Sequence, residues 1–110
     1  MDSAYLLWSL QNGYKGLVLE AMGQGNVPPM MLEGIQAWLD AGRPVVLVSR
    51  CLEGRALDTY AYQGGGHQLR NMGVIFGEDL TGQKARIKLM LALGVTGDAG
   101  EIRRMFEYLD

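Results

Sequence analysis

A loop rich in glycine and proline contains the residues best suited to contact a ligand. The stretch EAMGQGNVPPM, residues 20–30, follows the apolar run 17–19 and precedes a segment with helical periodicity. Gly23 and Gly25 allow the main chain to approach a ligand closely, and the amide of Asn26 offers two donors and an acceptor. This chemistry fits a small ligand that carries a carboxylate together with an amine or an amide.

Three other interpretations of this loop stay open from the residues alone. GQGN resembles the start of a dinucleotide fingerprint, but Pro28 replaces its third glycine, and Pro28 and Pro29 remove two donors that a phosphate needs. Asn26 can also serve only as the cap of the following helix. Finally, the loop can form part of a subunit contact, which is compatible with ligand binding at an interface.

The elements that position this loop alternate between strands and helices. Short, continuous apolar runs predict strands buried on both faces at residues 16–21, 45–48 and 73–76. Caps and apolar spacing predict helices that start at Asp2 or Ser3 (ending near Gly13), at Pro28-Pro29 (ending at Gly42), at His67, at Thr81 and at Asp98. The apolar face of the helix after Thr81 is wide, which predicts that this helix is deeply buried.

This alternation predicts one α/β domain over residues 1–110, a three-layer αβα arrangement around a small parallel sheet of the Rossmann or flavodoxin-like kind. The carboxyl ends of parallel strands share one edge, where ligands bind in open α/β sheets. The segments 23–26, 49–53 and 77–79 should therefore lie together and form the site.

Composition narrows the classes of partner. The 110 residues are 48% hydrophobic with a net charge of -2, and the longest basic cluster is the pair Arg103-Arg104, so no nucleic-acid partner is expected. No apolar run reaches the ~18 residues of a membrane span, and no signal-peptide pattern occurs. Cys51 is the single cysteine and His67 the single histidine, so no disulfide, metal site or cofactor is predicted, and a cytoplasmic location is expected.

Three segments together resemble a known family. GLVLEAMGQGNVP, GRPVVLVSRCLEG and MGVIFGEDLTGQKARIKLMLALG are similar, in order and spacing, to the C-terminal domain of bacterial L-asparaginases, with the cytosolic type I branch most alike. The family hydrolyses L-asparagine to aspartate and ammonia with a threonine in a T-G-G-T motif of its larger N-terminal domain. That motif does not occur here. The resemblance therefore implies no catalytic residue in this chain, an inactive isolated fragment, and its own N-terminal domain and homo-oligomer subunits as partners.

The resemblance also assigns roles to individual residues. Asn26 matches the asparagine of a G-x-G-N loop that completes the active site of a neighbouring subunit, and Gly23 and Gly25 belong to the same loop. The periplasmic branch has a glutamate near residues 58–62, where this chain offers Tyr60 and Tyr62 instead, and Tyr60 is a second candidate contact to substrate. Cys51 matches the cysteine of an allosteric asparagine site in some type I enzymes, whereas Glu20 stands at the position of that site's arginine, which argues against the site.

Two further expectations follow from the resemblance. The family domain opens with a strand before its first helix, so a fourth strand is implied to be missing, and the unpaired sheet edge predicts self-association. The alternatives to an asparaginase are the C-terminal part of a related tRNA-dependent amidotransferase subunit and a non-enzymatic α/β interaction module.

Overall fold

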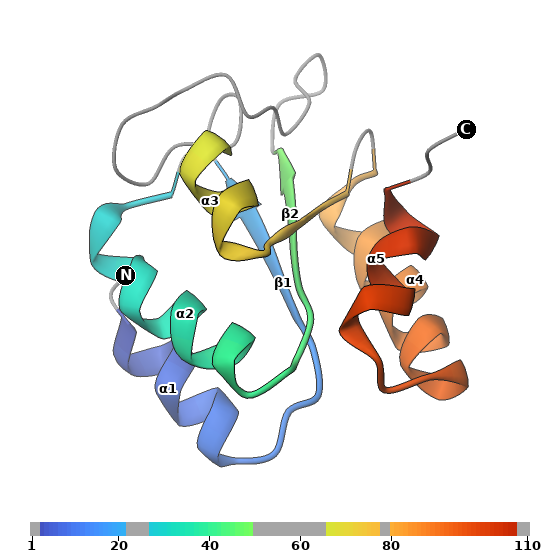
Figure 1. Cartoon of the computed structure of the whole chain (residues 1–110), viewed down its shortest axis with the longest axis horizontal. Helices are drawn as coiled ribbons and strands as arrows, with labels where there is room; N and C mark the ends of the chain where they lie inside the picture. Colours follow the sequence, from blue (N-terminus) through green and yellow to red (C-terminus); the bar gives the residue numbers. More distant parts are fainter. Residues whose placement is uncertain (1–2, 22–26, 50–65, 78–79, 108–110) are drawn as a thin grey trace.

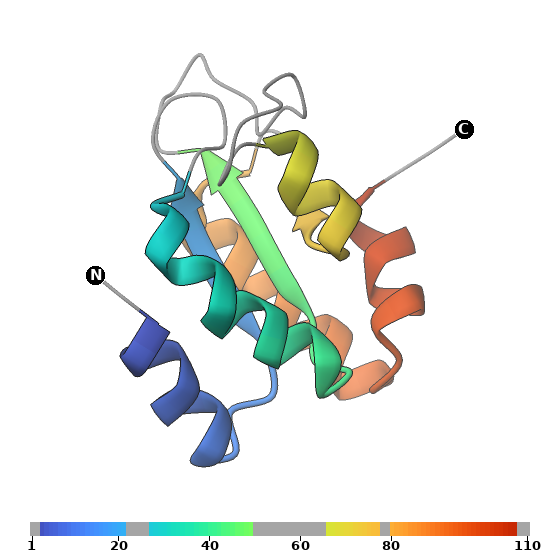
Figure 2. The same ribbon diagram turned by 60° about the vertical axis from the view of Figure 1, so that its left-hand side comes forward.

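Three parallel strands form a sheet that carries helices on both faces. The structure is a computed structural model that describes residues 3–21, 27–49, 66–77 and 80–107. Its elements are α1 (Ser3–Gln11), β1 (Leu17–Ala21), the 3-10 helix η1 (Pro29–Met31), α2 (Leu32–Asp40), β2 (Val45–Ser49), α3 (Gly66–Met72), β3 (Ile75–Phe76), α4 (Gly82–Val95) and α5 (Ala99–Phe106). Helices α1, α2 and α3 lie on one face of the sheet, and α4 and α5 lie on the other (Figures 1 and 2).

The sheet has the order β1-β2-β3, and both strand pairs are parallel. Residues 17–21 pair with 45–49, and Val46 and Leu47 pair with Ile75 and Phe76. The predicted αβα fold is confirmed. Strand β3 is shorter than expected because Gly73, at φ +112°, and Val74 donate their amide hydrogens back to the last turn of α3.

The central strand β2 is buried on both faces. Alternate side chains point to opposite sides of a strand, so Val45 and Leu47 enter one cluster and Val46 and Val48 enter the other. All four are fully buried. The first cluster includes Leu6, Ile35, Trp38 and Leu69 from α1, α2 and α3. The second includes Ala85, Leu89, Ile102 and Phe106 from α4 and α5.

Polar bonds join α1 to α2 and revise one expectation. The hydroxyl of Ser3 donates to the carbonyl of Met30 at 2.7 Å and accepts from the amide of Gly34 at 2.9 Å, so it links two elements instead of capping its own helix. The other predicted cap, Asp2, lies outside the described residues. The indole of Trp38 donates to the carbonyl of Leu6 at 2.8 Å. A Cβ at Gly34 would lie 2.8 Å from that of Leu6, so only glycine permits this close approach.

The predicted helix ends are mostly confirmed. Gly13 and Gly42 follow α1 and α2 at φ +85° and +75°, the left-handed conformation that glycine adopts without strain. Thr81 caps α4 by accepting a hydrogen bond from the amide of Lys84 at 3.2 Å. Asp98 caps α5 by accepting one from the amide of Glu101 at 3.0 Å. Each of these residues thus marks one end of a helix.

The expected deep burial of α4 is wrong. Only Ala85, Leu89 and Ala92 are buried. A second row of apolar residues faces outward, made up of Ile87, Met90, Leu91 and Val95. Helix α4 lies in an outer layer of the domain, so only the side toward the sheet finds partners. No helix in the described ranges has both the length and the apolar character needed to cross a membrane.

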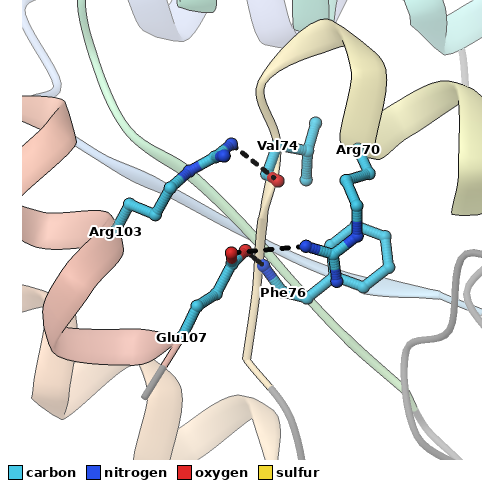
Figure 3. A network of polar contacts seen from close by, with 5 residues as sticks. All are labelled: Arg70, Val74, Phe76, Arg103 and Glu107. Carbon is cyan, nitrogen blue, oxygen red and sulfur yellow. Dashed lines mark hydrogen bonds and ion pairs between the residues drawn. The ribbon is translucent and has the colours of Figure 1, made fainter. Parts of the chain in front are cut away.

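Side chains close the outer edge of β3, as Figure 3 shows. The buried carboxylate of Glu107 accepts from the amide of Phe76 at 2.7 Å and from the guanidinium of Arg70 at 3.3 Å. Arg103 donates to the carbonyl of Val74 at 3.4 Å, and Arg70 lies 4.4 Å from the centre of the Phe76 ring. The residues after β3 thus supply the hydrogen bonds that a further strand would make.

We expect Glu107→Ala to lower the free energy of unfolding by about 1–3 kcal/mol, because it leaves the buried amide of Phe76 without an acceptor. Glu107→Gln keeps an acceptor and should cost less. Glu33→Ala, an exposed change on α2, is the control. Urea denaturation measures all three, and equal effects of Glu107→Ala and Glu33→Ala would contradict a structural role for Glu107.

Candidate functional site

The carboxyl ends of the three strands meet at one edge of the sheet. Ala21 at the end of β1 pairs with Ser49 at the end of β2, and Leu47 pairs with Phe76 in β3. Each strand end precedes one of the segments that the sequence predicts to form the site. The parallel register therefore confirms that these segments start from a common edge, with β1 and β2 ending side by side (Figure 1).

The predicted contact residues themselves lie outside the described residues. This applies to Gly23, Gly25 and Asn26 in the first segment and to Cys51 and Tyr60 in the second. Their roles stay predictions. What the structure supplies is the framework from which these segments start and to which they return.

Buried residues on both sides fix the ends of the Asn26 segment. Ala21, five residues before Asn26, is 1% exposed, and Val27, directly after Asn26, is 7% exposed. Both belong to the first core cluster, together with Leu19 and Met31. The main chain on either side of the candidate amide is therefore anchored by packing.

The helix start after Val27 argues against two of the alternatives for this loop. The N-cap position is occupied by Pro28, which makes no side-chain hydrogen bond, so the N-cap position is not that of Asn26. Pro28 and Pro29 have no amide hydrogen, and the amide of Met31 is already bonded to the carbonyl of Pro28 at 2.9 Å. Few donors remain for a phosphate at this helix start, which disfavours a nucleotide site.

The third strand end is a tight connection. The amide of Gly77 donates to the carbonyl of Leu47 at 2.8 Å, and the amide of Leu80 donates to the carbonyl of Gly77 at 3.1 Å. A Cβ at Gly77 would lie 2.5 Å from Val48 Cγ1, so a side chain has no room there. Packing on β2 therefore requires glycine where the chain leaves β3.

Glu20 has a structural neighbour that the sequence did not reveal. A Cβ at Gly82, the first residue of α4, would collide with Glu20 Oε1 and lie 2.8 Å from Glu20 Cδ. The carboxylate therefore rests against the amino end of α4, where the helix dipole favours a negative charge. In the sequence, this contact is signalled only by Gly82, because a glycine directly after the Thr81 cap leaves room for another side chain. The absence of the allosteric site stays a prediction.

A groove lies elsewhere on the described part of the chain. A groove of about 550 Å³ is lined by residues 14–18, around the start of β1, and by Arg86, Leu89, Met90 and Leu93 of α4. It lies near the amino end of β1, away from the edge where the candidate site starts. No group of three or more metal-binding side chains occurs among the described residues.

Comparison with known proteins defines the family. The model of the glutaminase/asparaginase C-terminal domain matches residues 1–106. The chain belongs to this family. It is 37% identical over 92 residues to the L-asparaginase of Bacillus licheniformis and 38% identical over 99 residues to a glutamyl-tRNA(Gln) amidotransferase subunit of Methanobrevibacter smithii. These matches cover 84% and 89% of the chain, but only 29% and 22% of the two relatives.

A solved structure agrees with the assignment. The crystal structure of the probable cytoplasmic L-asparaginase from Campylobacter jejuni superposes with a TM-score of 0.76 at 30% identity. The superposition includes 94% of this chain and 31% of that protein. The asparaginase C-terminal domain described here thus corresponds to less than a third of the length of these relatives.

The contact between Glu20 and Gly82 predicts a coupled effect on stability. Gly82→Ala should displace the Glu20 carboxylate and so lower the free energy of unfolding. In a Glu20→Ala background this loss should be smaller by roughly 0.3–1 kcal/mol, the range of a carboxylate at a helix start. A double-mutant cycle from urea denaturation measures this coupling. Gly94→Ala is the control, because nothing lies within 4 Å of a Cβ built there. Equal coupling of Glu20 to both glycines would contradict the contact.

Proposed function

We propose that the chain serves as the C-terminal domain of an L-asparaginase whose catalytic machinery lies in a separate N-terminal domain. The match of the asparaginase C-terminal family model over residues 1–106 carries this proposal. The parent enzyme hydrolyses L-asparagine to aspartate and ammonia. The likeness to the Bacillus and Campylobacter asparaginases supports this substrate.

In this proposal the domain supplies binding groups and the other domain supplies the nucleophile. Asn26 contributes amide donors and an acceptor to the substrate pocket of a neighbouring subunit, and the phenol of Tyr60 adds an uncharged hydrogen-bonding group. Covalent catalysis requires an activated nucleophile, and the sequence holds no T-G-G-T motif. The isolated chain is therefore expected to be inactive, and Cys51 is a thiol without a catalytic role.

The anchoring of the Asn26 segment supports this division of labour. Ala21 and Val27 are buried in the same cluster, so the segment between them is fixed at both ends relative to the sheet. Fixed ends reduce the entropy that a binding loop loses when it meets substrate. We place the parent enzyme in the cytoplasm as a homo-oligomer, and the likeness to the Campylobacter protein, a probable cytoplasmic enzyme, supports the location.

The second candidate is the C-terminal part of an amidotransferase subunit. The 38% identity to the Methanobrevibacter amidotransferase favours it as much as the 37% identity to the Bacillus asparaginase favours the first. The two candidates differ in the parent reaction. A test must therefore ask whether this domain supports the hydrolysis of free asparagine.

A chimaera provides that test. The matching segment of the Bacillus licheniformis L-asparaginase is replaced by this chain, and ammonia release from L-asparagine is measured. We expect an active enzyme in which Asn26→Ala lowers kcat/KM by roughly 1–3 kcal/mol of transition-state binding, the cost of an unmade buried hydrogen bond.

Asn71→Ala is the matched control, because Asn71 is an exposed asparagine on α3. It should leave kcat/KM unchanged. A folded chimaera without activity toward asparagine would count against the asparaginase assignment. If Asn26→Ala leaves kcat/KM of an active chimaera as unchanged as Asn71→Ala does, Asn26 is not a contact in the substrate pocket.

A further inference from the structure

An asparagine followed by a glycine stands at the carboxyl end of α1. In such a pair, the main-chain nitrogen of the glycine can attack the side-chain amide of the asparagine, because glycine has no Cβ to hinder the approach. Asn12-Gly13 is the only Asn-Gly pair in the sequence, since Asn26 and Asn71 both precede larger residues. Asn12 and Gly13 are exposed to solvent. Water therefore reaches the one asparagine whose neighbour leaves room for this reaction.

Hydrogen bonds at the end of α1 hold the two reacting groups apart. The side-chain Nδ2 of Asn12 donates to the carbonyl of Trp8 at 2.8 Å, so the amide group is turned back along the helix. The main-chain amide of Gly13 donates to the carbonyl of Leu10 at 3.2 Å. Both groups that must react with each other are thus bound to carbonyls of the preceding turn. The reaction requires that this turn opens first.

Arg43 fastens the same helix end from outside. The amide of Tyr14 donates to the carbonyl of Ser9 at 3.3 Å and, with the bond of Gly13, completes a Schellman motif. The guanidinium of Arg43, between α2 and β2, donates to the carbonyls of Leu10 at 3.1 Å and Tyr14 at 2.7 Å. It therefore holds the main chain on both sides of the reactive pair, although it is distant in sequence.

We propose that Asn12 is a site of spontaneous deamidation and that opening of this helix end sets its rate. When the turn opens, the nitrogen of Gly13 forms a bond to Cγ of Asn12, and the Cγ–Nδ2 bond breaks. Ammonia leaves with the proton of the Gly13 nitrogen, and a succinimide ring remains. Water then opens the ring at either carbonyl and gives aspartate or isoaspartate.

The product weakens the helix end that protected the amide. A carboxylate in place of the Asn12 amide cannot donate to the carbonyl of Trp8. It also adds negative charge at the carboxyl end of α1, where the helix dipole disfavours it. The reaction releases at most one ammonia per chain and needs no L-asparagine, so it is separate from the hydrolysis proposed above and is tested without substrate.

Peptide mass spectrometry of the purified chain, aged at neutral pH, tests the proposal. A tryptic digest separates Asn12 from Asn71, the exposed asparagine on α3 that serves as internal control. We expect the mass gain of an amide-to-acid conversion at Asn12 and none at Asn71, with the unaged chain as baseline. In urea the helix end is open in every molecule, so Asn12 should react roughly tenfold or more faster than in the folded chain.

Variants show whether the local opening controls the rate. Arg43→Ala should speed the reaction of Asn12 in the folded chain roughly five- to tenfold, because two hydrogen bonds from a charged donor are lost. Arg43→Lys keeps the cation and should give an intermediate rate, and it carries the test if circular dichroism shows Arg43→Ala unfolded. Arg104→Ala removes an exposed arginine on α5 and should leave the rate unchanged. Glu107→Ala, which weakens the β3 edge, should also leave it unchanged, because the whole fold need not open.

Several results would overturn the proposal. Asn12 could stay an amide in the aged chain, or react equally fast in the folded chain and in urea. The mass gain at Asn71 could equal that at Asn12. Arg43→Ala and Arg43→Lys could be no faster than Arg104→Ala, or Glu107→Ala could speed the reaction as much as Arg43→Ala does.

Discussion

Burial of β2 on both faces is the constraint on which the rest of the domain depends. Val45 and Leu47 hold the layer of α1, α2 and α3, while Val46 and Val48 hold the layer of α4 and α5. Because both clusters pack against this strand, its neighbours pair with it in a fixed register. That register brings the ends of β1 and β2 together and sets where the candidate site begins.

The β3 edge of the domain differs from its surface at β1 and α4. At β3, the side chains of Glu107 and Arg103 satisfy the amide and carbonyl groups that face outward. At β1 and along the outer side of α4, apolar residues and a groove remain open to solvent in the described part of the chain. Edge groups that are satisfied discourage added strands, whereas uncovered apolar surface favours association. The β3 edge is therefore satisfied by side chains, whereas apolar surface at β1 and α4 is uncovered in the described part of the chain.

Much of this architecture was predictable from the sequence, since its cause is local. Short apolar runs identified the three strands, and Thr81, Asp98 and Gly42 marked helix ends because capping depends on a few adjacent residues. The outward face of α4 was misjudged, because apolar spacing does not say what a helix packs against. The ties made by Ser3, Glu20 and Glu107 join residues far apart in the chain, so no local pattern reveals them. The common edge was predicted, but the contacts of Asn26 and Tyr60 stay predictions.

The central claim is that this polypeptide contributes binding groups while bond cleavage occurs in a domain it does not contain. The most direct measurement is ammonia release from L-asparagine by the purified 110-residue chain, with the Bacillus licheniformis asparaginase as positive control. A rate equal to that of buffer alone is predicted. Ammonia release above buffer that copurifies with the folded chain would contradict the claim.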